Sequence, residues 1–167
     1  MVVYIGHMST PQWIKKLGGH AGELYVAAEL SKRGIPNALL PENFSDDDIL
    51  IGGKDGRLSG YVQVKACHPD RADSFRLSKE DEDWVKAEDN AFIAFVWLGS
   101  PGKNESPRFW ITTKRDAGNC CIKHTQHNTD NPERRFFLPD KNGKQDKLNA
   151  SWENNWNLFK AYLPAEE

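Results

Sequence analysis

The sequence has few cysteines and no long hydrophobic run. Only three of its 167 residues are cysteine, which is an odd number and too few for a disulfide framework. The longest apolar run, from Ala91 to Leu98, has the length of a strand and falls far short of the ~20 residues that a transmembrane helix needs. The N-terminus lacks the charged start and the apolar stretch of a signal peptide. We therefore expect a cytoplasmic protein with no membrane partner.

An excess of charge of either sign is also absent. Lysine and arginine number 22, aspartate and glutamate number 24, and the net charge is -2. This balance excludes a wholly basic, histone-like coat on nucleic acid, although it is compatible with a local basic groove. Hydrophobic residues make up only 38% of the chain, yet it contains six tryptophans and eight phenylalanines. Disordered chains lack such large apolar side chains, so we expect a compact core with long polar loops.

The length fits a single domain over residues 1–167. Residues 1–10 are expected to form a flexible N-terminal arm or to be a tag remnant, because Gly6-His7-Met8 resembles a cloning scar. Residues 114–150 are polar and have little periodicity, which is typical of a long loop or a peripheral insertion.

Capping and stop signals outline the helices and strands. Thr10 and Pro11 begin a short helix that Gly18 and Gly19 end, and a second helix over 21–33 is followed by Gly34. Strands are expected at 38–40, 48–51, 61–67, 91–98 and 108–113, with a helix from Ser78 to about residue 88 and a terminal helix capped by Ser151. Four apolar residues of the terminal helix should pack on the core: Trp152, Trp156, Phe159 and Leu163. This order predicts an α/β fold with a mixed central β-sheet flanked by helices.

The 61–67 strand carries polar side chains on one face. Its alternation places Val62, Val64 and Ala66 on an apolar face and places Gln63 and Lys65 on the opposite face. If this strand pairs as a hairpin with the strand that begins at Asp48, the carboxylate of Asp48 approaches Gln63 and Lys65.

A second acid is expected on the inward side of the preceding helix. Glu23 lies three, four and seven residues before Val26, Ala27 and Leu30, so it shares their face, whereas Glu29 points to solvent. Two carboxylates, an amide and a lysine would then meet at one end of a sheet. Oxygen ligands of this kind suit Mg²⁺, which lowers the pKa of a bound water, and a nearby lysine can position or deprotonate that water.

The three segments together resemble the PD-(D/E)XK nuclease superfamily, which has the restriction endonuclease-like fold. They are Glu23 in GELYVAAEL, Asp48 in DILI, and Gln63-Val64-Lys65, which is similar to the Q-x-K variant in which glutamine replaces the second acid. The motifs cover residues 21–66. No proline precedes Asp48, and the adjoining Asp46 and Asp47 are alternative acids at this position.

The resemblance implies a Mg²⁺-dependent endonuclease that hydrolyses phosphodiester bonds of nucleic acid, in particular DNA, with Mn²⁺ able to substitute and a homodimer as a possible assembly. It further implies that Asp48 is the main metal ligand, that Glu23, Gln63 and the Val64 carbonyl complete the set, and that Lys65 is the catalytic lysine.

Four basic residues are candidates for contacts with phosphates if the long polar segment folds over the cleft. These are Lys114, Arg115, Arg134 and Arg135.

Other interpretations of the same residues remain open. A Gln-Val-Lys triplet is often a solvated strand edge, Asp46 to Asp48 also suit a polar turn, and Glu23 could pair with Lys65 without metal. The fold would then serve as a catalytically inactive nucleic-acid or protein binding module. Separately, a zinc site is suggested by the closely spaced residues Cys120, Cys121, His124 and His127. Adjacent cysteines, however, are poorly spaced for binding the same ion.

Overall fold

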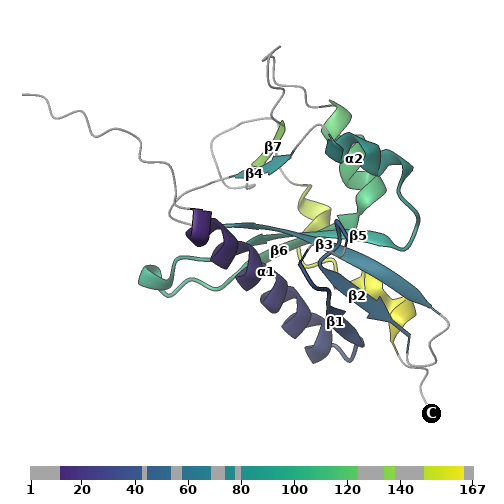
Figure 1. The fold of residues 1–167 in the computed structure, drawn as a ribbon, viewed down its shortest axis with the longest axis horizontal. Coiled ribbons are helices and arrows are strands. Elements are labelled where there is room, and N and C mark those ends of the chain that lie inside the picture. Colours follow the sequence, from purple (N-terminus) through teal and green to yellow (C-terminus); the bar gives the residue numbers. More distant parts are fainter. Residues whose placement is uncertain are drawn as a thin grey trace, which may run out of the picture.

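The computed structural model describes residues 12–42, 45–53, 58–68, 74–77, 80–123, 134–137 and 149–163. Its elements, in chain order, are α1 (Gln12–Lys32), β1 (Asn37–Leu39), β2 (Ile49–Gly52), β3 (Ser59–Cys67), β4 (Ser74–Leu77), the 3₁₀ helix η1 (Glu80–Lys86), β5 (Ala91–Trp97), η2 (Pro101–Lys103), β6 (Arg108–Thr113), α2 (Lys114–Lys123), β7 (Arg134–Phe137), η3 (Ala150–Trp152) and η4 (Trp156–Tyr162). Figure 1 shows α1 and α2 on opposite sides of the central sheet.

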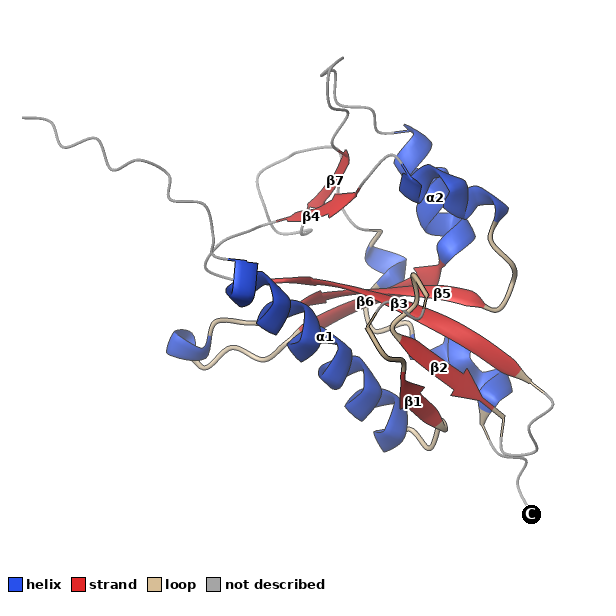
Figure 2. Cartoon of the chain, in the orientation of Figure 1, coloured by secondary structure: helices blue, strands red, loops and turns tan. Residues whose placement is uncertain are grey.

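The central sheet is mixed, as the order of elements predicted. It has five strands in the order β1-β2-β3-β5-β6 (Figure 2). β1, β2 and β3 are antiparallel neighbours, β3 and β5 are parallel, and β5 and β6 are antiparallel. The expected α/β class is therefore confirmed, as is the hairpin between the strands at 48–51 and 61–67. The pairing of β4 with β7 in a second sheet of two strands was not anticipated.

Each face of the central sheet has its own hydrophobic core. On the α1 face, Val26 and Leu30 of α1 pack with Val62 of β3, and Val64 and Ala66 contact the same cluster. The opposite core comprises the residues Cys67, Phe75, Trp84, Ile93, Phe95, Trp110, Ala117 and Trp152. The predicted two-faced character of β3 is thus correct, and it directs Gln63 and Lys65 away from α1.

The predicted helix break at Gly18-Gly19 is wrong, because α1 is one helix from Gln12 to Lys32. A glycine inside a helix costs only about 1 kcal/mol relative to alanine, and burial of Val26 and Leu30 against the sheet offsets it. The helix does end where predicted, since Gly34 follows it with φ of 77°. Thr10 and Pro11 lie outside the described residues.

Gly22 of α1 allows the helix to approach β3 closely. A Cβ added at Gly22 would lie 2.6 Å from the Cβ of Ala66, whereas a Cβ at Gly19 would meet nothing within 4 Å. We expect Gly22→Ala to destabilise the protein by about 1–3 kcal/mol through overpacking. Gly19→Ala should instead stabilise it by about 0.5–1 kcal/mol through helix propensity. Urea unfolding of both variants measures the difference, and equal effects would contradict the close approach.

The C-terminal segment differs from the predicted α-helix. It consists of the two 3₁₀ helices η3 and η4, and the oxygen of Asn149, rather than Ser151, caps η3 by accepting a hydrogen bond from the Ser151 N–H. Since a 3₁₀ helix has 3.0 residues per turn, Trp156, Phe159 and Tyr162 share one buried face. Leu163, which was expected in the core, is 43% exposed.

Two further segments were predicted incompletely. The helix expected from Ser78 is the 3₁₀ helix Glu80–Lys86, and Ser78 itself lies outside the described residues. Within 114–150, residues 114–123 form helix α2. Its buried face is made of small residues such as Ala117 and Gly118, so it leaves no apolar stripe in the sequence. The N-terminal arm over residues 1–10 lies outside the described residues.

Across the described portion of the chain, none of the helices combines the length and the apolar character needed to cross a membrane.

Candidate active site

Asp48 stands where β2 and β3 begin to separate. The last paired residues are Ile49 and Val62. One position further, the Asp48 N–H donates to the Val62 carbonyl at 3.0 Å, and the Asp48 carbonyl accepts from Leu40 N–H at 2.9 Å. The backbone of Asp48 is therefore held from both neighbouring strands, which fixes where its side chain starts.

The carboxylate of Asp48 bridges the gap between the two strands. Its Oδ2 accepts a hydrogen bond from Val64 N–H at 2.6 Å. The pKa of Asp48 is raised to about 6, mainly by burial and also by the charges of Glu23 and Asp47, whereas the hydrogen bond from Val64 and the charge of Lys114 act to lower it. A half-buried carboxylate that is subject to the charges of two other acids is a favourable place for a cation.

Glu23 approaches this carboxylate from α1. Its side chain is 27% exposed, and its Oε2 lies 3.4 Å from His20 Nδ1. Its charge acts on Asp48 and contributes to the raised pKa of that residue, so Glu23 on α1 lies within electrostatic reach of Asp48. Glu29, in contrast, pairs with Lys32 and Arg33 on the same helix, as predicted.

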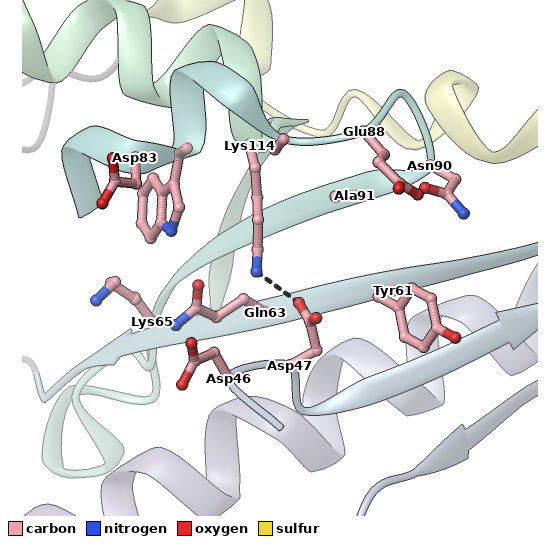
Figure 3. A pocket seen from close by; sticks show the side chains of 12 residues that line it. Asp46, Asp47, Tyr61, Gln63, Lys65, Asp83, Glu88, Asn90, Ala91 and Lys114 are labelled. Atoms are coloured by element: carbon pink, nitrogen blue, oxygen red, sulfur yellow. Dashed lines mark ion pairs between the residues drawn. The ribbon is translucent and has the colours of Figure 1, made fainter. Parts of the chain in front are cut away.

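Gln63 and Lys65 line a pocket of about 680 Å³ on the other face of β3 (Figure 3). The floor is β3, and η1, the turn before β5 and the first residue of α2 form the opposite wall. The lining residues are Asp46, Asp47, Tyr61, Gln63, Lys65, Asp83, Trp84, Ala87, Glu88, Asn90, Ala91 and Lys114. Glu23 and Asp48 are not among them, so the structure groups the predicted residues as two pairs. The hydrogen bond from Val64 N–H to Asp48 joins the two pairs across β3.

Gln63 and Lys65 bring two reactive polar groups, an amide oxygen and an ammonium, to the pocket side of β3. The Oε1 atom of Gln63 is buried and has no hydrogen-bond donor among the described residues. The ammonium of Lys65 lies 5.3 Å from the ring centroid of Trp84, within the range of a cation–π interaction. The amide oxygen can bind a cation, and the ammonium can bind an anion such as a phosphate.

Asp47 and Lys114 form a buried ion pair that no sequence pattern predicted. The Lys114 Nζ lies 2.7 Å from Asp47 Oδ1, with the side chains 9% and 19% exposed (Figure 3). Lys114, suggested above as a contact to phosphates, is thus a buried part of the pocket wall rather than an outer surface residue. One signal was available in the sequence, because Lys114 directly follows a buried strand and Asp47 lies two residues before another.

The remaining basic candidates are placed differently. Arg115 is exposed, pairs with Asp89 at 2.6 Å and donates to the Ala87 carbonyl. Arg134 and Arg135 belong to β7, and their side chains lie outside the described residues.

Breaking the buried ion pair should destabilise the protein. We expect Lys114→Met to lower the free energy of unfolding by about 3–5 kcal/mol, because it leaves Asp47 without its partner. Arg115→Ala, which breaks an exposed pair at the adjoining position, should cost at most about 1 kcal/mol. Urea unfolding at pH 7 compares them, and similar losses for the two variants would contradict the importance of burial. The double variant Lys114→Met with Asp47→Asn should recover part of the loss.

No three histidine, cysteine, aspartate or glutamate side chains lie close enough together to hold a metal ion within the portion that the structure describes. A cation near Asp48 would therefore use fewer carboxylates, together with amide, carbonyl or water oxygens. For the suggested zinc site, Cys120 is part of α2, while the Cys121 side chain, His124 and His127 lie outside the described residues.

No known family model matches the chain, and no curated protein matches it either. Among solved structures, it is similar to a bacterial homing endonuclease, I-Ssp6803I. The TM-score is 0.49 with 13% identity, covering 87% of this chain and 91% of the other. It is also similar to Hjc, a Holliday junction resolvase from the archaeal hyperthermophile Archaeoglobus fulgidus, with a TM-score of 0.38 and 19% identity, covering 68% of this chain and 86% of the other. Because both TM-scores are below 0.5, these likenesses add nothing to the chemistry of the site.

Proposed function

We propose that the protein is a divalent-metal-dependent endonuclease that hydrolyses phosphodiester bonds of DNA. The observation that supports this most is the position of Asp48. Its carboxylate is held by Val64 N–H, lies within electrostatic reach of Glu23, and adjoins the strand that carries Gln63 and Lys65. These are the residue types that metal-assisted phosphodiester hydrolysis requires, and the proposal is that the two pairs act together.

The residues fit Mg²⁺ as the metal, with Mn²⁺ as a substitute. Mg²⁺ is typically bound through one or two carboxylates and keeps several waters. Asp48 and Glu23 would supply the carboxylates, and Gln63 Oε1 and the Val64 carbonyl would supply further oxygens. The unsatisfied Oε1 of Gln63 and the raised pKa of Asp48 both indicate a place where a positive charge is favourable.

When bound, the metal would supply a water of lowered pKa and neutralise charge on the scissile phosphate. The ammonium of Lys65 would lie against that phosphate and offset the negative charge that develops during attack, or it would position the attacking water. The indole of Trp84, whose ring centroid lies 5.3 Å from the ammonium, would help to hold Lys65 in position for either role.

A second candidate function is a binding module that does not cut its ligand. The ion pair between Lys114 and Asp47 favours it, because a charged pocket whose groups neutralise one another can be purely structural. Both candidates would bind DNA, but only the first requires a divalent metal.

Two measurements on the purified protein distinguish these functions. Mg²⁺ or Mn²⁺ at millimolar concentration should raise the melting temperature, and Asp48→Asn should remove that increase. Labelled DNA and RNA, as single strands, duplexes and junctions, should then be incubated with Mn²⁺ or with EDTA. We expect cleavage of DNA only with metal. DNA binding without metal-dependent stabilisation or cleavage would favour the binding module. Cleavage of both strands of a duplex would also favour a homodimer, which sedimentation can test.

A further inference from the structure

We propose that the part of the pocket around Tyr61 binds one unpaired nucleobase of the DNA, beside the phosphate that is cut. This inference deepens the proposed function and rests on it. It names the substrate class as DNA in which a nucleotide at the cleavage step is single-stranded, bulged or extruded from the helix.

The pocket has two chemically different halves (Figure 3). One half contains Gln63 and Lys65, which belong to the candidate active site. The other half contains Tyr61 on the floor, with Glu88 and Asn90 facing it from the turn before β5. Tyr61 and Gln63 are two residues apart on the same face of β3, so their Cα atoms are about 7 Å apart. A nucleotide with its phosphate near Lys65 and Gln63 would therefore bring its base to Tyr61.

The size of the pocket suits a nucleotide and excludes a duplex. Its volume is about 680 Å³, within the range of ~300–1,000 Å³ common for small-ligand sites. A paired base in the helical stack cannot enter such a space. An unpaired or flipped base can, and its entry is easiest where it is already unpaired.

Tyr61 offers a surface on which a base can stack. It is 37% exposed although it lies on a central strand, and it is one of the residues that line the pocket. Exposed aromatic rings next to a cleavage site commonly hold single-stranded bases by stacking. Tyr25, which is 43% exposed, lies on α1 at the opposite face of the sheet and provides a matched control.

The charge beside Tyr61 favours a base over a phosphate. Glu88 brings its carboxylate to this half of the pocket, whereas Asp46, Asp47 and Asp83 lie in the half with Lys65 and Lys114 (Figure 3). Both ammonium groups lie away from Glu88 and Asn90 in Figure 3. The side-chain nitrogen of Asn90 donates to the Ser59 carbonyl at 3.0 Å, which leaves its oxygen as an acceptor. Acceptors of this kind recognise the exocyclic amino group of cytosine or adenine, which thymine lacks.

Binding to hairpin DNA in EDTA, where no strand is cut, tests the inference directly. The hairpins are either fully paired or carry one unpaired cytosine, adenine or thymine. We expect the wild type to bind the hairpin with unpaired cytosine about tenfold more tightly than the paired one. Tyr61→Ala and Tyr61→Leu should lose this preference, while Tyr61→Phe and Tyr25→Ala should keep it. Glu88→Gln should reduce the preference for cytosine over thymine. Melting temperatures verify that each variant is folded.

The outcomes separate this inference from the proposed function. Equal affinity for paired and unpaired hairpins, an unchanged preference in folded Tyr61→Ala, or absence of DNA binding would overturn the nucleobase site. Metal-dependent cleavage with no dependence on Tyr61 would overturn the nucleobase site and leave the nuclease intact. Binding of the unpaired base through Tyr61 without cleavage in Mn²⁺ would support the nucleobase site and refute the nuclease.

Discussion

Replacing Asp48 by asparagine should abolish metal-dependent cleavage and at the same time stabilise the metal-free protein at neutral pH. The loss of activity is expected to be about 10³-fold or more, since a metal contributes several kcal/mol to stabilisation of the transition state. Asparagine is nearly isosteric, and its amide oxygen can still accept the hydrogen bond from Val64 N–H. The backbone at the end of β2 should therefore remain in place.

The gain in stability follows from the raised pKa of Asp48. Its pKa is about 6 in the fold against an ordinary value of 3.8, so protonation favours the folded state. The stabilisation of the fold by protonated Asp48 is fully present below about pH 3.8 and is lost as the pH rises through 6. Above pH 6 the buried charge destabilises the wild type, and Asp48→Asn should be more stable by about 1–2 kcal/mol, allowing for partial exposure. Below about pH 4 the difference should vanish.

Urea unfolding in EDTA at pH 4 and pH 7.5 measures this dependence. Asp116→Asn, which removes an exposed acid from the first turn of α2, is the control and should affect neither cleavage nor the pH dependence. A destabilising effect of Asp48→Asn at pH 7.5 would show that the carboxylate is a structural acceptor and no candidate for a metal ligand. Full activity in that variant would exclude Asp48 from catalysis and turn attention to Asp46 or Asp47.

Replacing Lys65 by alanine should lower kcat by about 10²–10⁴-fold with little change in KM, because its ammonium acts on charge that appears only in the transition state. The ammonium of Lys65 lies 5.3 Å from the ring centroid of Trp84, so loss of this cation–π contact should also cost about 1 kcal/mol of stability. Cleavage of a labelled oligonucleotide across a range of substrate concentrations separates kcat from KM.

Lys65→Arg distinguishes the two roles open to this residue. Arginine keeps the positive charge but cannot act as a base, so partial activity would indicate charge stabilisation and none would indicate proton transfer. Lys160→Ala, which removes an exposed lysine from η4, should leave cleavage unchanged. If Lys65→Ala cleaves as fast as the wild type in Mg²⁺, the proposed mechanism is refuted.

Local patterns account for the parts of the fold that were predicted correctly. β5 reads as a continuous apolar run because both of its faces are buried. β3 reads as an alternation because Val62 and Val64 face the α1 core while Gln63 and Lys65 face the pocket. Those signals depend only on neighbouring residues, so the strands, their mixed class and the candidate residues could be named from the sequence.

The elements that were missed depend on partners distant in the chain. Gly18 and Gly19 break no helix because the sheet holds α1 in place. α2 was not predicted because a helix can pack through Ala117 and Gly118 without an apolar stripe. β4 has its partner in β7, about 60 residues later, and no local pattern reveals such a pairing.

The candidate site also has features set by the local sequence and features set by contacts between distant parts of the chain. The sequence alone determined which residues have the chemistry for metal-assisted hydrolysis, because the alternation of β3 and the spacing in α1 are local properties. Only the tertiary structure decided that the Asp48 carboxylate meets the Val64 N–H at the edge of β3, that Gln63 and Lys65 line a pocket, and that Lys114 reaches Asp47 rather than solvent. The reason is that these relations depend on how sheet and helices close over one another, and a charge buried by that closure must take the partner that the fold brings to it.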